Sequence, residues 1–428
     1  TQAFDLEAAY ALDSGDFTVA AVFNRTQLKP YFALTGQADF SGMLSGTVKA
    51  RGNRHRLKQA TAQMDVALLE LYYGAEELVR TQNLKGELKD RRFVLPESSW
   101  SILEQGHLNL QGNGAFDGSI DLSIDGSVPL RAADPFLTAV DDLGGQVIVR
   151  ATVAGKASNP SIDAQVKFEN IAVTLPSVSQ RLQGVNGKIQ VADSKVTFKD
   201  FAGQIGKGRF DLSGTLGLAK WQPENADLVF NAYQLPVEIP DTMSLLLNSS
   251  LSFKGDRENA FAEGQITVLD GLYYKDVNLN LLKSFTTVKR SAPPRKARTA
   301  IPYFGHTVLD VSVKRRLPIV VENNLAYLEI SPDLRMQGTV NNPVLSGRAR
   351  VDTGDIYYGG KTFVVKRGIV DFLNPYKIEP TLDIHSEVAV RDWLITLLIS
   401  GTLEDLKVEL SSNPPESRAD ILSLLCLL

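Results

Sequence analysis

The sequence has few of the residues on which disulfide-linked, metal-binding and membrane-spanning proteins depend. Its single cysteine, Cys426, excludes an internal disulfide. The longest apolar runs, at 393–399 and 421–428, fall far short of the ~20 residues that a membrane helix needs. Four histidines lie far apart without the spacing of metal ligands, so we predict no metal site and no cofactor. They are His55, His107, His306 and His385.

A surplus of basic charge is also absent, since the net charge is −4, and this argues against a nucleic-acid partner. The glycines at 354–360 invite comparison with a phosphate-binding loop. However, Asp355 stands where that motif requires glycine, and the residues that follow have the pattern of a strand. We therefore expect a tight hairpin at Gly359 and Gly360. No catalytic motif is found elsewhere, so we predict that the chain is not an enzyme.

What the sequence does contain is a repeated unit in which a strand ends in glycine and a short turn leads into another strand. One copy runs from Gly155 through Asn159-Pro160, and a second runs from Gly338 through Asn342-Pro343 at the same offsets. A third copy begins at Gly255 and lacks the proline. Repetition at long period is typical of stacked supersecondary units rather than of a compact enzyme.

Apolar and polar residues alternate with period two along most of the chain, as in the stretch from Ile162 to Glu169. Each strand then has one apolar and one polar face, and glycine-rich turns favour antiparallel connections. We predict an all-β fold built as a long antiparallel sheet. Alternation alone leaves open a stack of β-sandwiches, whose apolar faces cover each other. The segment from Pro414 to Leu425 is the best candidate for a short helix, and 132–139 is a weaker one.

We divide the chain into repeating units of about 100 residues over 1–300, followed by a C-terminal domain at 301–428 that continues the same sheet. Within the first part, residues 283–298 carry several lysines and arginines around Pro293-Pro294 and little apolar periodicity. We interpret this segment as a loop that leaves the sheet. Docking of an acidic partner or of anionic lipid headgroups is the other interpretation.

From about residue 316 onward, an ordered series of short motifs resembles the C-terminal domain of the TamB family. The matching segments are 338–347, 359–363, 367–372, 378–384, 399–402, 411–414 and 419–425. The resemblance implies a sheet curled into an open hydrophobic groove, related to the AsmA-like bridge-type lipid-transfer proteins. It also implies a periplasmic protein that is held in the inner membrane by an anchor outside this chain and works with an outer-membrane barrel of the TamA type.

On this interpretation, phospholipid acyl chains bind in the groove, and the apolar strand faces line it. Lipid tails exposed to water cost ~0.8 kcal/mol per CH₂, so such a protein must cover them along the whole route. The residues expected to line the groove are Ile162, Val166, Phe168, Phe210, Leu212, Phe253, Ile266, Val268, Leu309, Val311, Val313, Leu334, Met336, Ile395, Leu397 and Ile399.

The end of the chain allows two interpretations. A sheet that is not closed leaves an unpaired edge, which can accept a strand from another chain. Docking of the barrel partner there would involve Asp420, Ile421, Leu422, Leu424 and Leu425. Alternatively, these leucines plug the mouth of the groove. For the whole chain, a role in phospholipid transport or in outer-membrane protein assembly is the leading hypothesis, and a repetitive β-solenoid adhesin or secreted passenger is the alternative.

Overall fold

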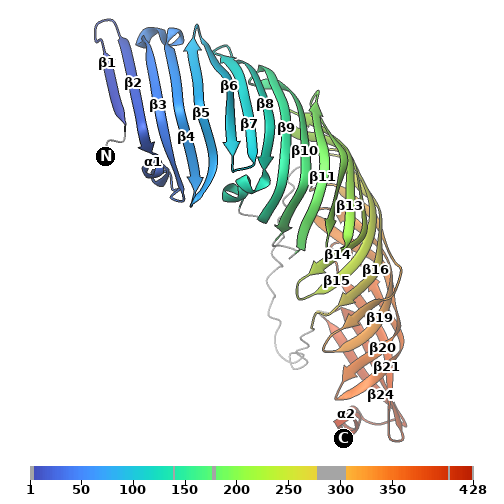
Figure 1. The fold of residues 1–428 in the computed structure, drawn as a ribbon. Coiled ribbons are helices and arrows are strands. Elements are labelled where there is room, and N and C mark those ends of the chain that lie inside the picture. The colour runs from blue at the N-terminus through green and yellow to red at the C-terminus, as the bar shows by residue number, and fades with distance from the viewer. Residues whose placement is uncertain (1–3, 138–139, 176–179, 277–304, 403–404, 427–428) are drawn as a thin grey trace. The chain divides into compact units, whose positions relative to one another are not determined.

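A computed structural model describes residues 4–137, 140–175, 180–276, 305–402 and 405–426. These residues form 24 strands and four short helices, and all 24 strands belong to one hydrogen-bonded sheet (Figure 1). The predicted all-β fold is therefore confirmed, and a stack of separate sandwiches is not. The loop predicted at 283–298 lies outside the described residues.

The elements of the first half of the chain are β1 (Asp5–Tyr10), β2 (Asp16–Gln27), α1 (Lys29–Leu34), β3 (Phe40–Asn53), η1 (Arg54–Gln59), β4 (Thr61–Tyr73), β5 (Glu76–Lys89), β6 (Arg92–Ile102), β7 (Gly106–Ala115), β8 (Ser119–Pro129), η2 (Leu130–Phe136), β9 (Asp141–Lys156), β10 (Asn159–Leu175), β11 (Gln180–Ala192), β12 (Lys195–Ile205) and β13 (Gly208–Ala219). Those of the second half are β14 (Gln222–Ile239), β15 (Met243–Asp256), β16 (Ala260–Tyr273), β17 (Val308–Arg315), β18 (Ile319–Glu322), β19 (Ala326–Thr339), β20 (Asn342–Tyr358), β21 (Lys361–Phe372), β22 (Pro380–Val390), β23 (Trp393–Thr402), β24 (Leu406–Asn413) and α2 (Arg418–Cys426).

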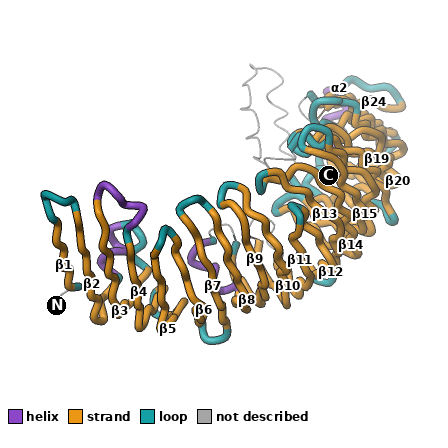
Figure 2. Tube along the Cα trace, turned by 90° about the horizontal axis from the view of Figure 1, so that it is seen from above, coloured by secondary structure: helices purple, strands orange, loops and turns teal. Residues whose placement is uncertain are grey.

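Strands that follow one another in the chain pair antiparallel from β1 to β10, and Figure 2 shows β1 to β9 side by side in that order. The same arrangement holds from β14 to β16 and from β18 to β24. Such a meander departs from the parallel coils of a β-solenoid, which was the alternative fold.

One junction breaks the antiparallel order. Strand β16 pairs in parallel with β17, and its last residues pair in parallel with β18. Both β17 and β18 then pair antiparallel with β19, so that together they occupy one position in the sheet. Parallel neighbours require a connection that returns the chain to the same end of the sheet.

Several connections are two-residue turns in which both residues have positive φ, as the right-handed twist of a hairpin favours. Gly359 and Gly360, with φ of 57° and 73°, form the turn between β20 and β21. The prediction of a hairpin at these glycines, instead of a phosphate-binding loop, is confirmed. Asp90 and Arg91 make the same kind of turn between β5 and β6 without glycine.

The helices are short and lie at strand ends. The predicted C-terminal helix is confirmed as α2, where Ser417 Oγ accepts a hydrogen bond from the Asp420 backbone N–H. The weaker helix prediction corresponds to the 3₁₀ helix η2. Sequence periodicity did not predict α1 or η1, because six residues are too few to show a helical repeat.

The chain packs as two compact units. The first comprises residues 1–176, 181–203 and 215–222, and the second comprises 177–180, 204–214 and 223–428. In the second unit, neighbouring strands and α2 bury one apolar cluster, in which Phe363, Ile395 and Leu397 are fully buried. The predicted boundary between residues 1–300 and 301–428 is based on sequence repeats. The packing of the chain into two units does not test that boundary, so it stays a prediction.

Candidate functional site

The first unit has an apolar face on which side chains from adjacent strands lie in register. Val166 of β10 pairs with Val149 of β9, and Phe168 pairs with Val147. Ile162 pairs with Val153, which in turn pairs with Leu122 of β8. The predicted residues Ile162, Val166 and Phe168 are each half-exposed and not buried in a core. Apolar surface therefore remains accessible along this face.

The opposite face of the same strands is polar. Lys167 lies between Val166 and Phe168 in the sequence, and it is exposed. Its ammonium group lies 2.5 Å from a carboxylate oxygen of Glu169. Because successive strand residues point to opposite sides, one strand presents Lys167 and Glu169 outward while it presents its valine and phenylalanine to the apolar side.

Phe210 and Leu212 of β13 continue the same pattern at the start of the second unit. The ring of Phe210 stacks on that of Phe230 in β14, with centroids 6.0 Å apart. On the other face, the Asn231 side chain donates a hydrogen bond to Asp211 at 2.9 Å. Leu212, two residues beyond Phe210 in the same strand, shares the apolar face by alternation.

Farther along the second unit, the predicted residues form cross-strand rows. Ile266 pairs with Val313, and Val313 pairs with Leu334, which places residues of β16, β17 and β19 in one row. A neighbouring row contains Val311 and Met336. The remaining predicted residues of this region, Phe253, Val268 and Leu309, lie on the same face by register. Val268 and Val311 are buried, whereas the others are half-exposed.

At the C-terminal end, Ile395, Leu397 and Ile399 of β23 lie on the apolar face. Ile399 pairs with Ile384 and Val408, and Leu397 pairs with Leu410. Ile395 and Leu397 are fully buried in the cluster that α2 covers. Unlike Ile162 or Val166, these two residues are inaccessible with α2 in this position.

The residues proposed for partner docking divide between the two sides of α2. Ile421 and Leu425 point into the cluster, each with 1% of its surface exposed, and Leu424 packs against it half-buried. Leu422 and Asp420 are exposed. This arrangement has the geometry of the plug, and it leaves Leu422 as the exposed leucine among these residues.

Two polar residues that sequence reasoning did not select also lie on the apolar face. Arg315 continues the alternation of Val311 and Val313 and pairs with Val268, so the sequence already contained the signal that places it there. Ser249 pairs with Ile266, and it is buried with no hydrogen-bond partner for its Oγ among the described residues.

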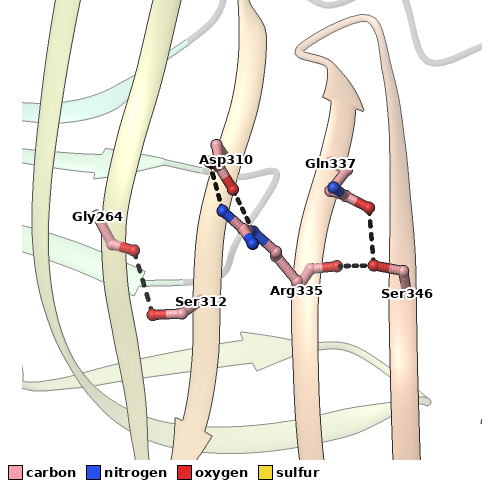
Figure 3. Close-up of polar contacts among 6 residues, drawn as sticks. All are labelled: Gly264, Asp310, Ser312, Arg335, Gln337 and Ser346. Carbon is pink, nitrogen blue, oxygen red and sulfur yellow. Dashed lines mark hydrogen bonds and ion pairs between the residues drawn. The ribbon is translucent and has the colours of Figure 1, made fainter.

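The outer face of the second unit carries a ladder of charged and polar contacts across strands. Arg335 of β19 donates hydrogen bonds to both carboxylate oxygens of Asp310 in β17, and Ser346 of β20 donates to Gln337 (Figure 3). The guanidinium group lowers the pKa of Asp310 below its usual range. Arg348 and Asp371 make a similar pair between β20 and β21. The outer face is thus adapted to water.

The described residues form at least two cavities. One, of about 410 Å³, lies on the outer face of the second unit beside Ser252, Glu263 and Asp310. Another, of about 700 Å³, lies at strand ends of the first unit, beside Glu76, Glu104 and Arg131 among others. In the described part of the chain, no three His, Cys, Asp or Glu side chains gather in a metal-binding arrangement.

Comparison with known protein families identifies the family of this chain. Residues 199–427, more than half of the chain, match the TamB C-terminal domain. The chain belongs to the TamB family. The predicted resemblance, which began near residue 316, is confirmed and extends upstream by more than a hundred residues. TamB proteins have roles in membrane-protein assembly and lipid transport, they work with an outer-membrane partner of the TamA type, and they are anchored in the inner membrane.

A curated relative of this TamB chain comes from a plant. Protein SUBSTANDARD STARCH GRAIN 4, chloroplastic, from Oryza sativa subsp. japonica, is 24% identical over 188 residues, which cover 42% of this chain and 8% of the rice protein. The chain therefore matches only a small part of that relative's length. None of the helices in the described ranges is both long and apolar enough to cross a bilayer.

Proposed function

We propose that this chain is part of a periplasmic bridge that carries phospholipid acyl chains on its apolar face between the inner and outer membranes. The observation that carries the proposal is the register of half-exposed apolar side chains on adjacent strands, such as Val149 with Val166 and Ile266 with Val313. A soluble domain ordinarily covers such rows with a second layer. Here the other face of the same strands carries charged residues such as Lys167 and Asp310.

The energetics of lipid transfer favour this use of the face. Two acyl chains contain about 30 methylene groups, and their exposure to water costs roughly 25 kcal/mol at ~0.8 kcal/mol per CH₂. A route that keeps the chains against apolar side chains at every step avoids most of that cost. Rows that repeat from strand to strand provide such contact, whereas an isolated pocket would hold the lipid at one place.

No chemical step is needed for this transfer, and we propose that the chain is not an enzyme and uses no cofactor. The headgroup is expected to stay in water at the open side of the groove while the chains lie against the apolar residues. Nucleic acid has no part in this function.

The partners that we propose follow from the family. An outer-membrane barrel of the TamA type receives the C-terminal end, and an anchor holds the protein in the inner membrane. Strand β24 pairs with β23 and with no other strand in the described ranges, so its second edge is available for strand addition. That edge supports a second candidate function, in which the chain assists the assembly of outer-membrane proteins by the barrel.

Native mass spectrometry of the chain purified from bacterial envelopes tests the proposed function. We expect mass additions that correspond to bound phospholipid and that are lost when Val166 and Phe168 are both replaced by aspartate. Replacement of the outward-facing Lys167 by aspartate is the matched control and should leave the additions in place. A chain that carries no lipid from any preparation would overturn the transport proposal and leave assembly as the function.

A further inference from the structure

Helix α2 covers the C-terminal end of the apolar face through two side chains one turn apart. Ile421 and Leu425 are each 1% exposed, and they belong to one cluster with Phe363, Ile395 and Leu397. The last three residues come from β21 and β23, whose apolar sides form the floor of this end of the face. The residues i and i+4 of a helix share one side, so both anchors point at that floor.

Side chains of the apolar face differ in exposure between the part that lies beneath the helix and the rest of the face. Val166, Phe168 and Ile266 are half-exposed in parts of the face that α2 does not cover. Ile395 and Leu397 are 0% exposed beneath it. Val268 and Val311, each 4% exposed, show that strand packing alone can bury positions of this face. At β23, Ile421 and Leu425 of the helix join residues of β19 to β23 in one buried cluster. The two helix side chains therefore occupy the volume in which a hydrocarbon chain would otherwise contact β23.

Helix α2 is attached to the sheet by the buried Ile421 and Leu425 and by Leu424, which packs half-buried against the same cluster. Outside the two buried anchors, the Trp393 indole N–H donates a hydrogen bond to Glu416 at 3.2 Å, just before the helix. Leu425 also lies over the β20–β21 turn, since a side-chain carbon at Gly359 would come within 3.3 Å of it. The outward side of the helix, including Leu422 and Ser423, is exposed. A helix of nine residues has little stability of its own and depends on its packing.

We propose that α2 is a displaceable plug, which closes the C-terminal end of the apolar face and competes with acyl chains for the same side chains of β21 and β23. This inference rests on the proposed lipid-carrying function. A helix of nine residues is ~13 Å long and can cover roughly three strands spaced ~4.8 Å apart. Helix and acyl chain exclude each other on this floor, so lipid arriving at the end shifts the helix toward its released state.

Site-specific photo-crosslinking in the full chain tests the plug. A benzophenone amino acid replaces Ile399, which packs against the covered cluster, or Val166 in the first unit as a reference of the same intermediate exposure. The protein is mixed with vesicles of phosphatidylethanolamine and phosphatidylglycerol and irradiated. With α2 intact, we expect lipid capture at position 166 and little capture at position 399.

The double variant Ile421→Ser/Leu425→Ser should raise capture at position 399 by about tenfold, as expected when a predominantly closed state becomes a minor one. Capture at position 166 should stay unchanged. Leu422→Ser, on the exposed side of the same helix, is the matched control and should behave as the unmodified chain does. Equal capture at 399 and 166 with α2 intact would overturn the plug but leave the lipid-carrying function standing. No capture at either position in any variant would overturn both.

A second measurement uses the unaltered chain, in case the double variant does not fold. Hydrogen exchange of the amides at 421–425 is followed with and without the same vesicles. The plug predicts faster exchange when lipid is present, because the released helix loses its packing and opens. Exchange that is unchanged or slower with lipid would contradict displacement.

Discussion

The backbone N–H of Gln234 donates a hydrogen bond at 2.7 Å to the side-chain oxygen of Asn248 on the neighbouring strand. Gln234 has a φ of 51° and lies in a bulge of β14, where two residues stand opposite Asn248 alone. The same contact recurs in β2, where the N–H of Arg25, with a φ of 52°, donates to Ser45. At these places a bulge bends the strand while the side chain opposite it satisfies the freed amide.

Removal of the Asn248 side chain should weaken this bulge. We expect Asn248→Ala to lower the free energy of unfolding by about 1 kcal/mol, because the Gln234 N–H loses its partner. Urea denaturation monitored by circular dichroism measures the change. Ser250→Ala, at an exposed position on the same face of β15, is the control and should change stability by less than about 0.5 kcal/mol. Equal effects of the two substitutions would show that the contact contributes nothing.

Adjacent residues of β23 should differ sharply when shortened. Ile395 is 0% exposed in the second unit's cluster, and Leu394 beside it is 42% exposed on the other face. Ile395→Ala leaves a cavity and should cost about 2–5 kcal/mol. Leu394→Ala should cost less than about 1 kcal/mol. Thermal unfolding of the two variants measures the losses in stability. Similar losses would contradict the burial of Ile395 in the cluster.

An arginine on the apolar face should have different consequences at different depths. Val166 is half-exposed, so the long side chain of Val166→Arg can extend to water, and we expect a loss of stability below about 1 kcal/mol together with reduced lipid binding. Val268 is 4% exposed, and Val268→Arg would bury an unpaired charge at a cost of about 3 kcal/mol or more. Denaturation curves combined with lipid co-purification separate the two effects. Comparable stabilities would contradict the burial of Val268.

Acid should weaken the ladder on the outer face. The hydrogen bonds from Arg335 hold the pKa of Asp310 below its usual value, so the native state binds this proton less readily than the unfolded chain does. The stabilisation is then complete above about pH 5 and is lost as the pH falls below about 4. Asp310→Asn should reduce stability at pH 7 and narrow the difference in stability between pH 7 and pH 3. A difference that Asp310→Asn leaves unchanged would contradict this contribution of the pair.

The sequence predicts those parts of this fold that depend on local alternation. The alternation of apolar and polar residues predicts that Val166 and Lys167 lie on opposite faces of their strand. The pair Gly359-Gly360 predicts a hairpin, because a two-residue turn with positive φ at both positions favours glycine. Helix α2 is too short for a helical repeat to be recognised with precision, yet the sequence placed a short helix between Pro414 and Leu425.

Features that depend on pairing between distant segments could not be predicted. The parallel junction of β16 with β17 joins residues about 47 positions apart, such as Phe261 and Val308, and no local pattern encodes the direction of such a pair. Bulges such as the one at Gln234 carry no distinctive sequence. Burial also differs between Val166 and Val268, although both alternate with polar residues, because burial depends on what packs over each strand.

The proposed function requires acyl chains to contact one face of these strands and not the other. Benzophenone amino acids placed at adjacent residues test it directly, in the pairs Lys167 with Phe168, Arg209 with Phe210, and Lys254 with Phe253. After irradiation with phospholipid vesicles, we predict lipid capture at the three phenylalanine positions and little at their basic neighbours, so that capture alternates along each strand. Equal capture at both members of every pair, or capture mainly at the basic positions, would contradict this requirement.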